Sequence, residues 1–240
     1  MRLRLVKQEG GIVRIALRRR EGVPRVAVPL VLLLVFVSGV VFGGVTKGQT
    51  RTEPTGGESG TVSSSGIPYR PHDDAGPTAL VETIRERRAN GRLLNLDRML
   101  LHSPAFAQGW NGMFAAIRGQ LSVDPKLREL SIMFIAVLNH ADYEWAQHES
   151  AFIAAGGSPE QMDSIREPDS ALDDSDVFDE AELATLALTY EMTRNVTVTD
   201  ATMRRVRALL PDSEVVELVG TIAGYNMVSR FVVATGVAVE

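Results

Sequence analysis

The order of hydrophobic and polar residues divides the chain into three parts. Residues 26–45 form an apolar run with no charged side chain and a single polar one, Ser38. A helix of that length spans the hydrocarbon core of a bilayer, so we expect a transmembrane helix or signal anchor here. Residues 46–66 are rich in Gly, Ser and Thr and predict a flexible, disordered linker. In residues 67–240 apolar residues recur at helical spacing, which predicts one all-α domain.

Helix starts in residues 67–240 are marked by N-cap residues followed by proline. Ser103, Asp124 and Ser158 each precede a proline, which suits the first helical position because no backbone N–H is needed there. Gln161, three residues after Ser158, completes a capping box. Segments typical of strands are nearly absent. The expected helices cover residues 104–118, 126–140, 143–155, a short stretch from 159, 179–194, 199–210 and 213–233.

Charge is distributed unevenly along the chain. Residues 1–25 carry a net charge of +6, and the remainder carries −11. Basic residues that precede an apolar helix stay in the cytoplasm, so we expect the domain to be membrane-anchored outside the cytoplasm, or secreted if the segment is cleaved. A later translation start would instead leave it cytoplasmic. Because phosphate binding needs clustered positive charge, the acidic body predicts no nucleic-acid partner.

The chain contains no cysteine. This excludes a disulfide, a thiolate nucleophile, a zinc–thiolate site and a dithiol redox centre on this chain. A peroxidase without thiols would need haem or another metal, and the sequence offers no convincing ligand set for one.

One short polar segment between two apolar helices concentrates functional side chains. Glu144 and His148 are four residues apart and so share one face of a helix. A carboxylate beside an imidazole fixes its tautomer and raises its pKa, which prepares a general acid or base near neutral pH. Glu129 lies on the preceding apolar helix and needs a partner there, with Arg128, Arg230 or an arginine of a neighbouring subunit as candidates. The alternative for all three residues is a structural hydrogen-bond network.

A metal site is the other possibility for this segment. His140, Glu144 and His148 are spaced i, i+4 and i+8. Successive residues at this spacing are rotated by about 40° around the helix, so the outer two point apart and we predict no metal site. The acidic residues between 169 and 182 lack the turn glycine and ligand spacing of an EF-hand and predict a solvated loop.

Residues 67–240 resemble the carboxymuconolactone decarboxylase-like superfamily, which includes the alkylhydroperoxidase D proteins. The peroxidases of that superfamily carry a Glu and, after eleven residues, Cys-x-x-Cys-x-x-x-His. Counted from Glu129, this chain has Ala141 at the first cysteine, Glu144 at the second and His148 at the histidine. It is therefore similar to the cysteine-free branch, whose signature Tyr-Glu-Trp-x-x-His falls on residues 143–148 here.

The resemblance implies an all-helical alkylhydroperoxidase D-like fold that assembles into homo-oligomers such as trimers or hexamers, with the site near a subunit interface. It also implies chemistry without a metal or organic cofactor and without dithiol peroxidase activity. We expect Glu129, Glu144 and His148 to be catalytic and to move protons on a small lactone or carboxylate substrate. The alternative is a non-catalytic oligomeric binding protein that keeps the fold. The expected substrate contacts are two aromatic side chains and one amide: Tyr143, Trp110 and Asn226.

Overall fold

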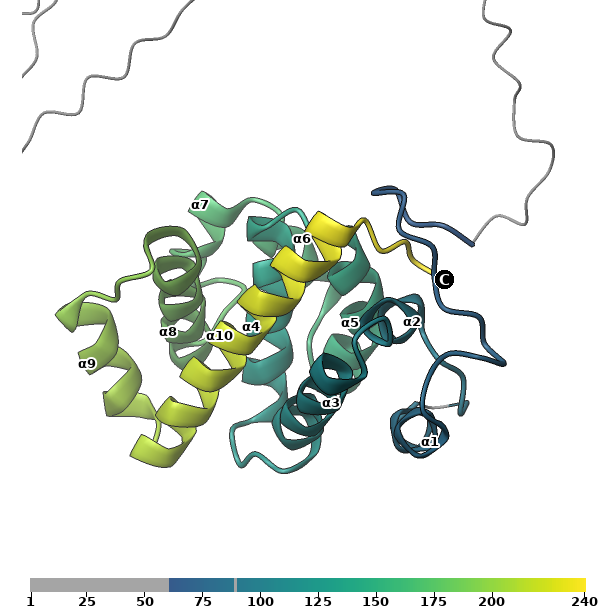
Figure 1. The fold of residues 1–240 in the computed structure, drawn as a ribbon. Coiled ribbons are helices and arrows are strands. Elements are labelled where there is room, and N and C mark those ends of the chain that lie inside the picture. Colours follow the sequence, from purple (N-terminus) through teal and green to yellow (C-terminus); the bar gives the residue numbers. More distant parts are fainter. Residues whose placement is uncertain (1–60, 89) are drawn as a thin grey trace, which may run out of the picture. The chain divides into compact units, whose positions relative to one another are not determined.

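The computed structural model describes residues 61–88 and 90–240, all of which belong to one folding unit, Glu53–Glu240. These residues form helices joined by short loops and contain no strand, only an isolated β-bridge between Val62 and Pro68 (Figure 1). The predicted all-α fold is confirmed. The helices are α1 (Thr78–Glu86), α2 (Asn95–Leu100), α3 (Pro104–Gly119), α4 (Pro125–Leu138), α5 (Asp142–Ala154), α6 (Pro159–Ile165), α7 (Pro168–Ala171), α8 (Glu180–Tyr190), the π-helix η1 (Glu191–Asn195), α9 (Asp200–Leu209) and α10 (Asp212–Thr235).

Several helices begin at the side-chain caps that the sequence indicated. Asp124 accepts a hydrogen bond from the backbone N–H of Lys126, and Ser158 and Gln161 form the expected capping box. Ser103 precedes α3 but its side chain caps no backbone group. The short helices α1, α2 and α7 were not marked by the pattern, because too few turns are present for a helical period to stand out.

Helix α4 is the centre of the domain. In Figure 1 it lies behind α10, with α8 on one side and α3 and α5 on the other. Its residues Leu130, Ile132, Met133 and Phe134 have no exposed surface. Each such side chain contributes roughly 1.5–3 kcal/mol by its burial. The helix is therefore a rigid base for the polar groups that it carries.

Residues 61–66, at the end of the expected linker, pack against the end of α10. The backbone N–H of Ser64 donates to the carbonyl of Gly236 at 3.1 Å, and the hydroxyl of Ser65 donates to the carbonyl of Thr235 at 2.7 Å. The packed domain therefore begins before residue 67. The rest of the expected linker, 46–60, and the apolar segment 26–45 lie outside the described residues. No helix in the described part of the chain combines the length and the apolar character needed to cross a membrane.

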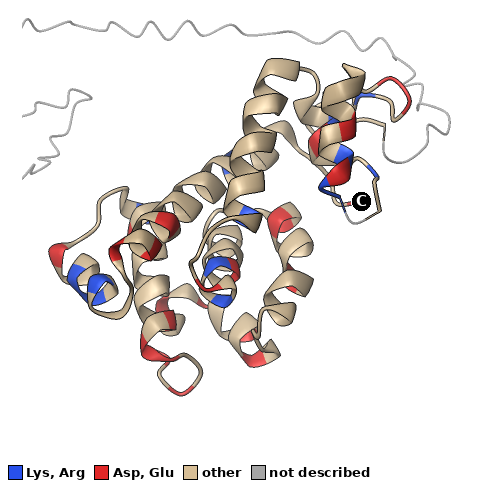
Figure 2. Cartoon of the chain, turned by 90° about the horizontal axis from the view of Figure 1, so that it is seen from below, with Lys and Arg blue, Asp and Glu red and all other residues tan. Residues whose placement is uncertain are grey.

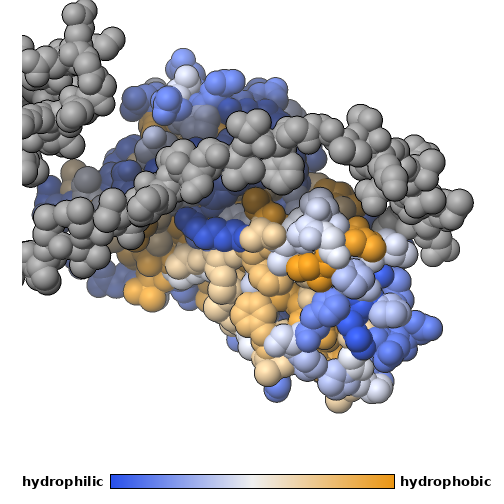
Figure 3. All heavy atoms as spheres, turned by 45° about the horizontal axis from the view of Figure 1, so that its top comes forward, coloured by the Kyte–Doolittle hydropathy of each residue, from blue (hydrophilic) through white to orange (hydrophobic). Residues whose placement is uncertain are grey.

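Large apolar side chains remain exposed on α3 and α10. Phe106 and Met113 on α3 are 45% and 40% exposed, and Met227 and Val233 on α10 are 37% and 52% exposed. The face drawn in Figure 3 also shows apolar side chains gathered between hydrophilic ones. Exposed apolar patches are more often binding surfaces for other molecules than surfaces that contact solvent alone.

Candidate functional site

The connection between α4 and α5 brings the predicted acid–base residues together. Residues 139–141 reverse the chain, with His140 in the left-handed region at φ 54°. The two helices pack against each other along their lengths. Glu129 on α4 consequently meets His148 on α5, although nineteen positions separate them in the sequence.

Glu129 holds one nitrogen of the His148 ring. Its Oε2 lies 2.7 Å from Nδ1 of His148, and the two residues are only 2% and 3% exposed. The other oxygen of Glu129, Oε1, lies 3.3 Å from Nε of Arg128, which was one of the predicted partners. Arg230, another candidate, instead donates to the carbonyl and side-chain oxygens of Asn226.

Glu144 faces the other nitrogen of the same ring. Its Oε2 lies 3.7 Å from Nε2 of His148, one helical turn away, and the residue is 3% exposed. The imidazole is thus placed between two buried carboxyl groups. The contact with Glu129 has hydrogen-bond length, and that with Glu144 is longer.

The two carboxyl groups differ in electrostatic environment. Burial raises the pKa of Glu129, but the hydrogen bond from His148 and the positive charge of Arg128 outweigh it, so this pKa lies below its usual value. Burial also raises the pKa of Glu144, and there the more distant charges of Arg118 and Arg88 do not reverse the effect. Two carboxyl groups whose environments separate their pKa values are suited to different roles in proton transfer.

A pocket opens onto Glu144 and His148. Its cavity volume is about 40 Å³, and it is partly open to solvent. Trp110, Phe114 and Tyr225 supply an aromatic wall, and the ring of Tyr225 meets that of His148 edge-on at 5.1 Å. Arg87, Arg88 and Arg118 contribute positive charge, while Tyr143 and Gln147 contribute polar groups.

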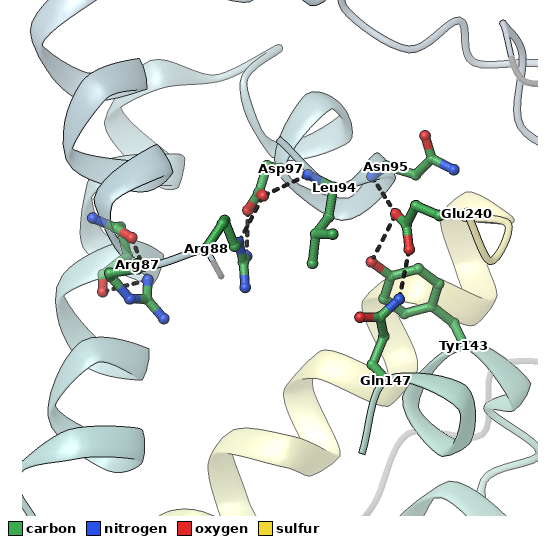
Figure 4. A network of polar contacts seen from close by, with 9 residues as sticks. Arg87, Arg88, Leu94, Asn95, Asp97, Tyr143, Gln147 and Glu240 are labelled. Atoms are coloured by element: carbon green, nitrogen blue, oxygen red, sulfur yellow. Dashed lines mark hydrogen bonds and ion pairs between the residues drawn. The ribbon is translucent and has the colours of Figure 1, made fainter. Parts of the chain in front are cut away.

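Figure 4 shows the polar contacts around this pocket. Arg88 forms a two-bond ion pair with the buried carboxylate of Asp97, with its Nε 2.9 Å from Oδ2. Arg87 donates to the carbonyl and side-chain oxygens of Asn111. Beside them, the Glu240 carboxylate accepts hydrogen bonds from neutral donors on α2 and α5.

Two of the three expected substrate contacts line the pocket. Tyr143 and Trp110 do so, but Asn226 does not. The amide of Asn226 donates to Thr193 and to the carbonyl of Ile222, and its oxygen accepts from Asn139 and Arg230. All of the hydrogen-bonding capacity of the Asn226 side chain is used inside the domain, where it joins α10 to η1 and to the end of α4.

The sequence did not mark several residues of this region, among them Arg118 and Gln147 of the pocket and Glu240 of the hollow that adjoins it. They come from α3, from α5 and from the segment after α10. Their side chains are partly or fully exposed, so no burial pattern marked them. Only Gln147 lay inside the segment that the sequence singled out.

The described residues contain no group of three His, Cys, Asp or Glu side chains arranged to hold a metal ion. His140 is exposed and lines a separate hollow with Trp145 and Arg166 rather than the pocket of His148. His140 lies between α4 and α5 with a left-handed backbone, so it does not share a helix face with Glu144 and His148.

Comparison with known proteins identifies what this domain is similar to. The model of the carboxymuconolactone decarboxylase family matches residues 104–191, which include Glu129, Glu144 and His148. A comparison with curated proteins gives no significant match.

Similar solved structures share the fold at low sequence identity. An uncharacterised peroxidase-related protein with an alkylhydroperoxidase AhpD core from Ralstonia eutropha JMP134 has a TM-score of 0.60 and 16% identity, with 71% of this chain and 90% of that one covered. A peroxidase-related protein from Silicibacter sp. TM1040 has a TM-score of 0.58 and 17% identity, with 71% and 89% covered. A cysteine-to-alanine variant of the debrominase Bmp8 in complex with 2,3,4-tribromopyrrole has a TM-score of 0.57 and 17% identity, with 72% and 90% covered. Residues 104–191 therefore match the carboxymuconolactone decarboxylase family, and the described domain shares its fold with AhpD-like proteins.

Proposed function

We propose that this protein is a small-molecule enzyme that uses Glu/His acid–base chemistry, without a cofactor, on a lactone or carboxylate substrate. One observation carries the proposal. The imidazole of His148 lies between a carboxylate of lowered pKa, Glu129, and a carboxyl group of raised pKa, Glu144, at the wall of a pocket that also contains arginines.

Glu129 sets the proton on the His148 ring. An ionised carboxylate can only accept hydrogen bonds, so Nδ1 of His148 carries the hydrogen that lies between them. In the neutral ring, Nε2 is then the basic atom, and it faces Glu144. Glu144, which burial favours in its protonated form, is the acid of the pair.

A decarboxylation by this pair requires a single proton from the protein. The bond between the substrate carbon and its carboxylate breaks, carbon dioxide leaves, and the electron pair is delocalised onto the lactone carbonyl. The substrate carbon that has lost its carboxylate then takes a proton from Glu144. His148 returns a proton to Glu144 from solvent, so the balance is one proton taken up for each carbon dioxide released. Buried acids and bases of this kind contribute roughly 10²–10⁴-fold to rates.

The test is turnover of a carboxymuconolactone-type substrate, followed by its ultraviolet absorbance. The purified full-length chain, in a nonionic detergent, is compared with Glu144→Gln and His148→Asn. We expect each variant to lower kcat by at least about a hundredfold. Glu149→Gln, an exposed carboxylate on the same helix, is the matched control and should keep the wild-type rate. Equal rates in all variants would contradict the proposal, and binding without turnover would favour a non-catalytic binding protein.

We also propose that the protein is a homo-oligomer. The exposed apolar side chains of α3 and α10, among them Phe106 and Met227, support a contact between copies there. Light scattering on Phe106→Lys should show a smaller assembly than the wild type, and an unchanged mass would count against this surface. Membrane anchoring through residues 26–45, with the domain outside the cytoplasm, stays a prediction, which fractionation of cells with and without this segment tests.

A further inference from the structure

A second hollow adjoins the catalytic pocket on its arginine side. The two share Arg87, Arg88, Leu94, Arg118 and Gln147, and the second, here called the outer hollow, adds Asn90, Arg92 and Glu240. Four arginines therefore line one opening. Acidic positions are spread over several helices and loops of the domain (Figure 2), so this concentration of positive charge is local.

The four arginines differ in the hydrogen-bond and ion-pair partners of their side chains. Arg88 is held by Asp97, and Arg87 is held by Asn111. Arg118 and Arg92 are exposed and have neither a hydrogen-bond partner nor an ion-pair partner among residues 61–88 and 90–240. Arg118 is also the one of these two that reaches the inner pocket, beside Glu144. It is thus a free cation next to the acid–base pair.

The carboxylate of Glu240 is held in the same hollow by neutral groups. It accepts hydrogen bonds from the backbone N–H of Asn95 at 2.6 Å, from Nε2 of Gln147 at 2.5 Å and from the hydroxyl of Tyr143 at 3.4 Å (Figure 4). It forms no ion pair with any described arginine. The negative charge of Glu240 therefore lies within the positive electrostatic potential of the arginines, although it pairs with none of them.

We propose that the outer hollow is an anion-binding subsite, that Arg118 is its principal cation, and that the carboxylate of Glu240 competes with the anionic group of the ligand for this field. The ligand class is a small carboxylate with a planar, unsaturated body. Its body packs on the aromatic wall formed by Trp110, Phe114 and Tyr225, and its carboxylate pairs with Arg118 in a two-bond geometry.

This inference deepens the proposed function, since it places the ligand with its anionic end at Arg118 and its other end toward Glu144. Its test measures binding alone, so that it can fail or succeed independently of turnover. Specificity arises because a neutral analogue leaves the guanidinium without a partner for its hydrogen bonds.

The experiment is titration calorimetry of the full-length chain in nonionic detergent, with benzoate as the probe and benzamide as its neutral isostere. We expect benzoate to bind and benzamide to bind at least tenfold more weakly. Arg118→Gln should weaken benzoate binding by about tenfold, the loss of one charge-assisted pair. Arg204→Gln, an exposed arginine on α9 outside the pocket, makes the same charge change and should leave the affinity unaltered.

Glu240→Gln tests the competition. The amide keeps the size of the side chain and removes its charge, so benzoate should bind about threefold more tightly, as expected for the loss of an exposed like charge. Glu149→Gln is the charge-matched control. Thermal melts of each variant verify that it is folded.

Three outcomes would contradict the inference. Equal affinities in Arg118→Gln and Arg204→Gln would remove Arg118 from the subsite. Weaker benzoate binding in Glu240→Gln would show that Glu240 positions Gln147 and Tyr143 rather than competing with the ligand. Absence of benzoate binding would overturn the assignment to planar carboxylates. Benzoate binding without any turnover of a lactone substrate would leave the subsite standing and remove only the proposed reaction.

Discussion

Replacing Glu144 by Gln should stabilise the protein at neutral pH while it removes activity. The side chain is 3% exposed, and its nearest charged partner, Nε2 of His148, is 3.7 Å away. Burial raises the pKa of this carboxyl group, which means that its ionised form is held less favourably in the folded state than in the unfolded chain. An amide has nearly the same shape and no ionised form, so the substitution removes that cost.

The size of the effect follows from the incomplete solvation of the ionised group. An incompletely hydrogen-bonded buried polar group costs about 1–3 kcal/mol. Because His148, Arg118 and Arg88 offset part of this cost, we expect a gain near the lower limit, about 1 kcal/mol. In a domain of this size such a gain raises Tm by roughly 2–4 °C.

The pH dependence separates this cause from better packing. The pKa of Glu144 is higher in the folded protein than its value of 4.5 in the unfolded chain. Protonated Glu144 therefore contributes stability that is fully present below pH 4.5 and is lost as the pH rises through the folded-state pKa. The Tm advantage of Glu144→Gln should therefore be present at about pH 8 and vanish at about pH 4. Thermal melts of both proteins across this range measure it. A constant difference at all pH values, or a destabilised variant at about pH 8, would refute the reasoning.

Four other substitutions have expected outcomes that thermal melts check. Glu129→Gln should lower Tm by roughly 4–8 °C at neutral pH, because the charge-assisted buried hydrogen bond between Glu129 and His148 contributes about 2 kcal/mol to stability. This decrease in Tm should become smaller as the pH falls through the lowered pKa of Glu129, and a decrease that is unchanged in acid would contradict an ionised Glu129. Asn226→Ala should lower Tm by a similar amount without changing KM, because its amide bonds Thr193 and Asn139 rather than the pocket, and a changed KM at unchanged Tm would restore it as a substrate contact. Gly157→Ala should lower the free energy of unfolding by about 1–3 kcal/mol, because the new methyl group would overlap the fully buried ring of Phe152. Gly112→Ala, on the exposed face of α3, has open space around the new methyl group and should raise the free energy of unfolding by about 0.5–1 kcal/mol.

The long helices were predicted well because the signals that mark them, side-chain caps and apolar residues at helical spacing, lie within the helix or next to it in the sequence. Asp124 and Ser158 cap the helices that they precede, and the apolar surroundings of α4 follow from its central position. The ends were less accurate. The helix expected at 179–194 changes to a π-helix at Glu191, a difference of hydrogen-bond register that no pattern of side chains specifies.

The site was predictable where it depends on one pair of adjacent helices. Glu144 and His148 are joined by helical spacing, and Glu129 reaches them because α5 folds back along α4. Arg118 reaches the same pocket from α3, and Glu240 lines the adjoining hollow from the segment after α10, so their proximity to the site depends on tertiary packing alone. Asn226 was predicted as a substrate contact because a polar amide on an apolar helix needs a partner, and in the structure that amide has buried partners within the domain.

Ala141 and Glu144, which fall on the two cysteine positions of the motif given in the sequence analysis, have different environments in this structure. Ala141 is 1% exposed and belongs to the apolar core at the start of α5, whereas Glu144 opens onto the pocket beside His148. A thiol at position 144 would be a nucleophile, whereas the carboxyl group of Glu144, with its raised pKa and its Oε2 3.7 Å from Nε2 of His148, is suited to carrying a proton. The buried partner of that ring, Glu129, serves either chemistry, since both need an imidazole of fixed tautomer. Under the proposed function, Glu144 therefore carries a proton where the peroxidase motif has a thiol, and the hydrogen bond that His148 donates to Glu129 is the same in both.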